Sequence, residues 1–280
     1  MATFRTSQLF SRDLYNGVNV SVSLPEWVFR PDQWSAAFLR GLRRCTRDWR
    51  SLCVWEVGVG SGLNLIILGK LLGDVTWYYS DYDSRCVPLA TSNLEAAKMG
   101  HLDFCPLEGA WDLVTPPAGM HAPAVDVIFG CLPQVPLAHA DLSVGDKIAH
   151  YYDPERYPKA HLNVLGLGLN ETLLVQARDV LLPCGTVVLN LSGRPGLKRL
   201  KTMFQFCGYE AEVIYEEMIP QHWQTSVASL ASLEEAGQHD FEFFADARGK
   251  EKINAREAEV RRMCSKSVFH KIYVIAGRTA

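Results

Sequence analysis

The sequence lacks an apolar run of the roughly 18 residues that cross a bilayer, and residues 1–10 are polar, without the apolar core of a secretion signal. It also lacks an excess of basic residues, because 28 Lys and Arg stand against 31 Asp and Glu, for a formal net charge of −3. These absences argue against a membrane protein and against nucleic acid as the main partner. We expect a soluble, cytoplasmic protein.

Paired cysteines are absent as well. The 8 cysteines are far apart in the sequence, no two of them form a CxxC pair, and no two histidines stand at the spacing of metal ligands. The pattern therefore favours neither a disulfide framework nor a metal site, and we expect no bound metal. Most of the cysteines lie in apolar runs, where a buried thiol packs as a small hydrophobic group.

What the sequence does contain is a regular alternation of short β-rich runs with helical patterns, which is typical of an α/β fold with a mostly parallel sheet. The continuous apolar character of the runs indicates strands that are buried on both faces. Seven strands are predicted, at 51–57, 74–81, 101–107, 124–131, 185–193, 209–219 and 268–277, with helices at 63–73, 83–100, 169–182 and 195–206.

The chain is expected to divide into an N-terminal lid segment, residues 1–50, and a main domain, residues 51–280. An insertion at 138–165 and a long excursion at 220–267 interrupt the main domain and are expected to form a substrate cap, the excursion serving as the C-terminal lid segment. The insertion follows the fourth strand, so it would lie at the carboxyl end of the sheet, where open α/β folds bind ligands.

The stretch "EVGVGSG" places Glu56 at the end of the first strand and Gly58, Gly60 and Gly62 in the turn that follows. Glycines let the backbone turn sharply and approach a ligand closely, and Glu56 can accept a hydrogen bond from an ammonium or a ribose hydroxyl. Asp81 ends the second strand, where a carboxylate can bind both hydroxyls of a ribose. A role as a helix cap is the alternative for Asp81, and NAD would also suit such a glycine turn.

The glutamate directly before the first glycine makes the turn resemble the first motif of class I S-adenosylmethionine (SAM)-dependent methyltransferases. One subgroup of these enzymes ends the fourth strand on an Asn-Pro-Pro-Tyr-like motif that holds the hydrogens of an amine or amide nucleophile. Here the corresponding "GCLPQ" has Cys131 in the first position, Pro133 and then Gln134. A thiol is a weak hydrogen-bonding group, so the substitution favours a nucleophile without N–H, such as a thioether.

Longer segments extend the resemblance. The stretches "GCLPQV", "LGLGLNETLLVQA", "LNLSGRPG", "HDFEFFADARG" and "SLPEWVFRPDQWSAAFLRGL" are similar to segments in the methyltransferase domain of methionine S-methyltransferase, over about residues 20–277. Around His161, the chain departs from the acidic residues of the plant enzyme. It also lacks that enzyme's second, aminotransferase-like region, and so resembles a compact bacterial type.

This resemblance implies a Rossmann-like fold and methyl transfer from SAM to the thioether of L-methionine, which yields S-methylmethionine and S-adenosylhomocysteine. The donor would contact the glycine turn, the second strand end and the loop after the third strand. The residues expected there are Glu56, Gly58, Gly60, Gly62, Asn64, Asp81, Tyr82, Trp111 and Cys131.

For the acceptor, Arg194 is a candidate for the carboxylate and Glu242 for the ammonium, although a solvated turn arginine and an ordinary half-buried strand would give the same patterns. Aromatic residues of the expected ligand loops would exclude water and attract a sulfonium. The remaining substrate candidates are Trp34, Cys131, Pro133, Gln134, Tyr151, Tyr152 and Tyr157. No acid or base is assigned, because a thioether carries no proton.

Two other functions fit the same motifs. One is an N-methyltransferase for a protein glutamine or a small amine. It would need a group at residue 131 that holds the N–H of the nitrogen to be methylated. The other is a non-catalytic SAM-binding partner subunit, although Glu56, the glycine turn and Asp81 are all intact.

Overall fold

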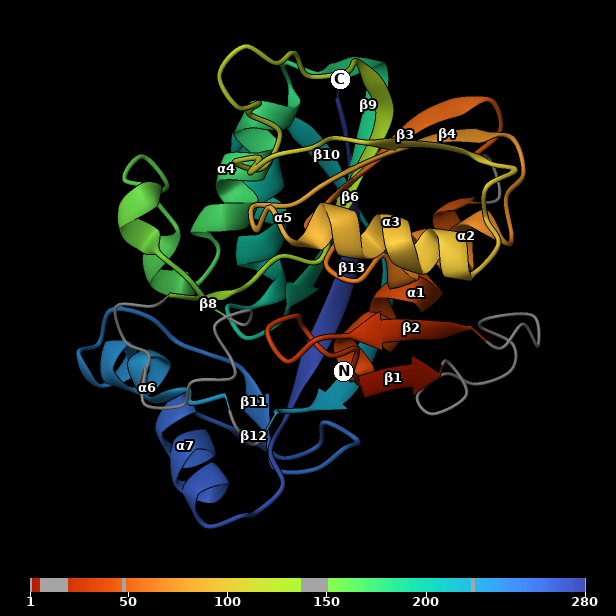
Figure 1. Cartoon of the computed structure of the whole chain (residues 1–280). Helices are drawn as coiled ribbons and strands as arrows, with labels where there is room; N and C mark the ends of the chain where they lie inside the picture. Colours follow the sequence, from red (N-terminus) through yellow and green to blue (C-terminus); the bar gives the residue numbers. More distant parts are fainter. Residues whose placement is uncertain (1, 6–19, 47–48, 137–150, 223–224, 280) are drawn as a thin grey trace.

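The computed structural model describes residues 2–5, 20–46, 49–136, 151–222 and 225–279. Its centre is one mixed sheet (Figure 1). Seven longer strands of this sheet run in the order β5-β4-β3-β6-β9-β13-β10. They are β3 (Leu52–Val57), β4 (Val75–Ser80), β5 (Asp103–Pro106), β6 (Val125–Gly130), β9 (Leu181–Ser192), β10 (Tyr209–Pro220) and β13 (Phe269–Thr279). The predicted seven-stranded, mostly parallel α/β sheet is therefore confirmed.

The pairing within the sheet creates a switch point beside β3. The first five of these strands pair in parallel, while β13 is antiparallel to both β9 and β10. The chain leaves β3 for β4 on one side and reaches β6 on the other, so the ends of β3, β4 and β6 meet at one edge. Open sheets of this kind bind ligands at that position. Two short strands, β11 (Phe243–Phe244) and β12 (Lys252–Ile253), extend the sheet beside β13.

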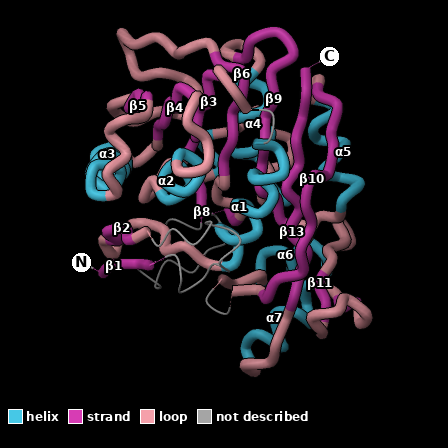
Figure 2. The backbone as a smooth tube through the Cα atoms, turned by 90° about the vertical axis from the view of Figure 1, so that its right-hand side faces the viewer, coloured by secondary structure: helices cyan, strands magenta, loops and turns pink. Residues whose placement is uncertain are grey.

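Helices cover both faces of the sheet, because side chains alternate along each strand. Val54 of β3 packs in one apolar cluster with α1 (Gln33–Cys45), α2 (Leu63–Gly69) and α3 (Cys86–Ala96). Trp55, the next residue, packs in the opposite cluster with α4 (Gly168–Ala177) and α5 (Leu197–Phe206). Figure 2 shows α2 and α3 on one side of the sheet and α5 on the other.

Some element ends differ from the prediction. The helix expected at 83–100 begins at Cys86 and ends at Ala96. The helix expected at 169–182 ends at Ala177, because the chain enters β9 at Leu181, four residues before the predicted strand. Both helices, α3 and α4, are therefore shorter than predicted.

The remaining segments lie outside the seven-stranded core. Near the N-terminus, β1 (Ala2–Arg5) pairs with β2 (Ser21–Leu24), and β7 (Val135–Pro136) pairs with β8 (Tyr151–Tyr152). Two 3-10 helices follow, η6 (Pro154–Arg156) and η7 (Asn163–Leu165), and the excursion contains α6 (Ala228–Glu235) and α7 (Ala255–Met263). Residues 138–150 of the predicted insertion lie outside the described residues. Among the described helices, none has the length and apolar character needed to cross a membrane.

Candidate cofactor and substrate site

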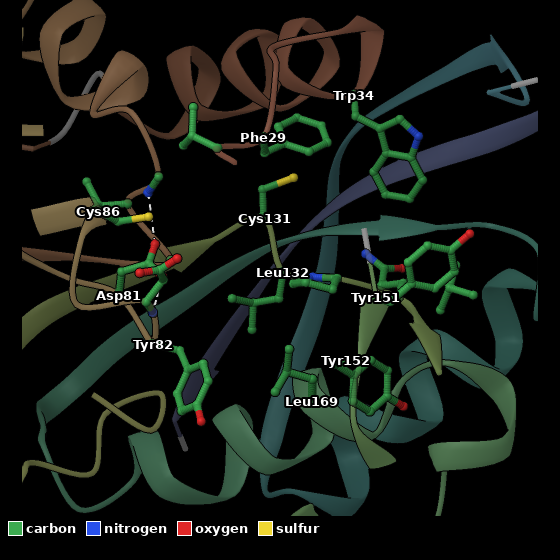
Figure 3. Close-up of a pocket in the computed structure, with 18 of the residues that line it drawn as sticks. Phe29, Trp34, Asp81, Tyr82, Cys86, Cys131, Leu132, Tyr151, Tyr152 and Leu169 are labelled. Carbon is green, nitrogen blue, oxygen red and sulfur yellow. Dashed lines mark hydrogen bonds between the residues drawn. The ribbon is translucent and has the colours of Figure 1, made fainter. Parts of the chain in front are cut away.

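A cavity of about 820 Å³ lies at the edge where β3, β4 and β6 end. Its wall combines the turns after these strands with residues of the segments 27–35, 151–157 and 221–225, and with Arg194 after β9. Figure 3 shows Cys131 and Leu132 in the middle of this cavity, with Asp81 on one side and Trp34 and Tyr151 on the other. The structure thus gathers most of the predicted site residues around one space.

The glycine turn after β3 has a left-handed backbone at each predicted glycine, with φ of 77° at Gly58, 52° at Gly60 and 75° at Gly62. Gly58 and Gly60 line the cavity. Around Gly60, a Cβ atom would have no neighbour within 4 Å, so its backbone is open to a ligand. Gly62 instead faces α3, where a Cβ would lie 3.0 Å from the Cβ of Ala90. Gly62 therefore serves close helix packing and does not line the cavity.

Glu56 lies behind the glycine turn and is only 2% exposed. Its Oε1 accepts a hydrogen bond from Asn64 Nδ2 at 2.7 Å, while Oε2 has no partner among the described residues. Burial raises the pKa of Glu56 from 4.5 to about 8. Asn64 itself lines the cavity. Glu56 does not line the cavity itself, so the pair leaves one buried carboxylate oxygen without a hydrogen bond beside a residue that does.

Asp81 lines the cavity as predicted, and its carboxylate accepts hydrogen bonds from the backbone of Gly60 and of Asp83, both at 2.9 Å. Burial raises its pKa above the ordinary value. The next residue, Tyr82, also lines the cavity and is 57% exposed. The guanidinium of Arg156 lies 3.9 Å from the centre of the Tyr82 ring. Two backbone amides therefore hold the carboxylate of Asp81 in the cavity wall, next to Tyr82.

Trp111 is not part of the cavity wall among the described residues. It is 1% exposed, packs edge-on against Trp55 with 5.2 Å between the rings, and donates from Nε1 to the carbonyl of Glu108 at 3.0 Å. The loop that contains Trp111 still reaches the cavity through Ala110 and Leu113. Trp111 thus supports this part of the wall by packing against Trp55 in the core.

At the end of β6, the side chains of Cys131 and Gln134 are tied to β9. Cys131 Sγ accepts a hydrogen bond from Asn190 Nδ2 at 3.2 Å, and burial raises the pKa of this thiol to about 12. Gln134 donates to the carbonyl of Asn190 at 2.7 Å and accepts from the backbone of Ser192 at 2.8 Å. Both residues and Pro133 line the cavity. The thiol is protonated near neutral pH, and the amide of Gln134 is already used at both ends.

The predicted aromatic residues Trp34, Tyr151, Tyr152 and Tyr157 all line the cavity. Their polar atoms hold the wall together, since Tyr152 donates to the backbone of Asn163 at 3.2 Å and Tyr157 donates to Asp112 at 2.6 Å. The rings of Tyr152 and Tyr157 lie 6.2 Å apart. These residues therefore present a largely apolar surface to a ligand.

The two candidates for the charged groups of the acceptor differ in position. Arg194 lines the cavity and is 4% exposed, and burial lowers its pKa to about 10. Glu242 does not line it, and its carboxylate lies 3.3 Å from Nζ of Lys252. Its backbone nonetheless donates to the carbonyl of Arg194 at 2.8 Å. The structure brings Arg194 to the cavity and directs the side chain of Glu242 away from it.

Sequence reasoning missed Asp32, Leu132, Arg156 and Leu169, which also line the cavity. Asp32 caps α1 by accepting from the backbone of Trp34 at 2.8 Å, and burial raises its pKa to about 6. An acidic residue after a proline and before an apolar helical run predicts this cap. Nothing in that local pattern indicates that the same carboxylate also faces a ligand space.

No family model matches the sequence. Methionine S-methyltransferases are similar to it: the Zea mays protein is 26% identical over 253 residues, and the Hordeum vulgare protein is 27% identical over 252. Each alignment covers 82% of this chain and 23% of the relative. The chain thus spans about a quarter of the length of these relatives.

Two solved structures resemble the chain more distantly. A methyltransferase from Pyrococcus furiosus has a TM-score of 0.48 at 13% identity, covering 91% of this chain and 88% of its own. The YcgJ protein from Bacillus subtilis has a TM-score of 0.49 at 13% identity, covering 85% of this chain and 97% of its own. The fold class rests on the strand order described above.

The strand order, the glycine turn after β3 and the carboxylate after β4 resemble those of Rossmann-like, class I SAM-dependent methyltransferases. More particularly, the chain resembles the methionine S-methyltransferases, and the resemblance predicted from the sequence is confirmed. Enzymes of the class that the chain resembles use SAM as the methyl donor. The residues present fit such a donor, because the backbone of Gly60 is open, Asp81 faces the cavity, and buried Oε2 of Glu56 lacks a partner.

Proposed function

We propose that the chain transfers a methyl group from SAM to the thioether of L-methionine and forms S-methylmethionine and S-adenosylhomocysteine. Sequence similarity to methionine S-methyltransferases supports the substrate class. The observation that carries the proposal is the end of β6, where Cys131 accepts from Asn190 and the amide of Gln134 is bonded at both ends to β9. These side chains leave no strong acceptor for the N–H of an amine or amide, which a thioether does not need.

On the donor side, the proposal places the ribose at Asp81 and the methionine portion at Gly58, Gly60 and Asn64. The orphaned oxygen of Glu56 supports a role in accepting from the donor ammonium, directly or through a small movement of Asn64. Tyr82, beside Asp81, is proposed to cover the adenine. Trp111 and Gly62 then act by supporting the wall, since neither lines the cavity.

On the acceptor side, Trp34, Tyr151, Tyr152 and Tyr157 are proposed to surround the thioether. Their rings exclude water and attract the positive sulfonium, as aromatic faces attract other organic cations. The lid assignment of residues 1–50, 138–165 and 220–267 is part of this proposal. It is supported by the cavity lining that the segments 27–35 and 151–157 contribute, together with Gln221, His222 and Thr225.

The proposed methyl transfer needs no general acid or base. Bound SAM supplies the methyl group on an electrophilic sulfonium. The thioether attacks through a lone pair and carries no proton, so the wall has to orient the two sulfur atoms and keep the site dry. The thiol of Cys131 remains protonated at neutral pH because burial raises its pKa to about 12, which suits a packing role and not that of a nucleophile.

The test is a methyl-transfer assay with purified protein and labelled SAM, comparing L-methionine with a glutamine-containing peptide and common amines. We expect label in S-methylmethionine only. Asp81→Ala, which removes the proposed ribose contact, serves as the matched variant and should lose most activity at low donor concentration. Label on the peptide or an amine would favour N-methylation, and donor binding without transfer to any acceptor would favour a non-catalytic SAM-binding subunit.

A further inference from the structure

Arg194 is a buried cation that has no anionic partner in the part of the chain that the structure describes. It follows β9 directly, lines the cavity and is 4% exposed. Its Nε donates to Ser192 Oγ at 2.6 Å, and its carbonyl accepts from the backbone of Glu242 at 2.8 Å. No hydrogen bond or ion pair from the described residues reaches its Nη atoms. The guanidinium is thus anchored at one edge while its other edge remains available to a ligand.

The titratable groups around Arg194 do not balance its charge. His270 is 1% exposed, and its burial together with the nearby Arg194 lowers its pKa to about 3, so the ring is neutral. Glu242 directs its carboxylate to Lys252, at 3.3 Å. Tyr151 lies close enough to favour the charged form of Arg194, but an ordinary phenol carries no charge near neutral pH. A buried charge is costly unless it is paired, so this site is complete only with an anion.

The position of Arg194 separates it from the donor side. Hydrogen bonds link it through Ser192 to Gln134, which follows Cys131 in the cavity wall. Its neighbour Tyr151 lies on the opposite side of Cys131 from Asp81 (Figure 3). An anion at Arg194 would therefore belong to a molecule bound beyond Cys131, across the cavity from the proposed ribose contact.

We propose that Arg194 binds the carboxylate of the methyl acceptor and restricts the acceptors to thioethers that carry a carboxylate. This inference rests on the proposed function and adds the determinant of specificity. The planar guanidinium matches a carboxylate with two parallel N–H donors, which fixes the orientation of the bound molecule. The distance from carboxylate to sulfur then sets which thioethers can reach the donor methyl.

The inference predicts discrimination among analogues of one thioether. L-methionine and 3-(methylthio)propanoate keep the carboxylate, whereas L-methionine methyl ester and 3-(methylthio)propylamine lack it. We expect the wild-type protein, saturated with S-adenosylhomocysteine, to bind L-methionine on the order of 30- to 1000-fold more tightly than its methyl ester, the range typical for a buried charged pair.

The variant Arg194→Met removes the charge but keeps an unbranched apolar stem, and Arg194→Lys keeps the charge without the fork. Lys198→Met, which removes an exposed cation from α5, is the matched control. Calorimetry measures the affinity of each protein for S-adenosylhomocysteine, and then the affinity of the S-adenosylhomocysteine-saturated protein for each analogue. We expect Arg194→Met to bind S-adenosylhomocysteine within about threefold of wild type and to lose the preference for methionine over its ester. We expect Arg194→Lys to keep a preference for methionine of no more than about tenfold.

The outcomes separate the inference from the proposed function. Equal binding of methionine and its ester by the wild type overturns the inference even if Arg194→Met does not fold. Loss of S-adenosylhomocysteine binding in a folded Arg194→Met also overturns it, because the carboxylate would then be that of the donor. If label from SAM reaches only other carboxylate-bearing thioethers, with the same dependence on Arg194, the inference stands and methionine as the acceptor is refuted.

Discussion

Replacing Glu56 by Gln should change how the stability of the protein depends on pH. The folded-state pKa of Glu56 is about 8 against an ordinary value of 4.5, chiefly because burial disfavours its charged form. The folded protein therefore holds this proton more tightly than the unfolded chain. The stability associated with Glu56 is fully present below pH 4.5 and is lost as the pH rises through 8, by about 1.4 kcal/mol per unit.

Glu56→Gln keeps the oxygen that accepts from Asn64 at 2.7 Å but does not titrate. Between pH 5 and pH 8, we expect the free energy of unfolding of the variant to rise relative to wild type by about 2 to 4 kcal/mol. Urea denaturation of both proteins at four pH values measures the difference, and the other titrating groups cancel. Glu95→Gln, which removes an exposed carboxylate from α3, is the control. A constant difference across this range would refute the assignment of a protonated Glu56.

The same group provides a test of donor binding. If Glu56 accepts from the donor ammonium, binding lowers its pKa and releases a proton near neutral pH. The affinity for S-adenosylhomocysteine should then increase with pH up to about 8, by at most tenfold per unit. Calorimetry in buffers of different ionisation enthalpy detects the released proton. Wild type and Glu56→Gln with the same proton release would show that Glu56 does not contact the donor.

Three further substitutions test other parts of the site. Asp81→Ala should weaken S-adenosylhomocysteine binding by about 1–3 kcal/mol, and equal affinity by calorimetry would refute the ribose contact. Cys131→Asn should lower methionine turnover without abolishing donor binding, whereas unchanged steady-state kinetics would assign the thiol to packing alone. Gly166→Ala should lower the free energy of unfolding by more than about 2 kcal/mol, because φ is +75° and a Cβ would overlap the carbonyl oxygen of Gln134; a smaller change in urea denaturation would contradict this.

Local sequence patterns were sufficient for the sheet and for placing the glycine turn beside Asp81 at one edge of it. The periodicity of strands and helices indicates which of their faces are buried. A glycine turn between them indicates a left-handed backbone conformation that other residues rarely adopt. Gly58, Gly60 and Asp81 could be placed together because the carboxyl ends of adjacent parallel strands meet at one edge. The helix ends were less predictable, since the start of β9 depends on its partner β6 and not on its own residues.

By itself, the sequence determined the order of strands and helices, the glycine turn and the carboxylate after the second strand, because each depends on residues that are close in the chain. Only the tertiary structure decided which polar groups reach the cavity. Trp111 is buried against Trp55, Glu242 lies beside Lys252, and Arg194 faces the cavity. Such partners are brought together by packing, and whether a charge is paired or left for a ligand depends on what lies next to it in space.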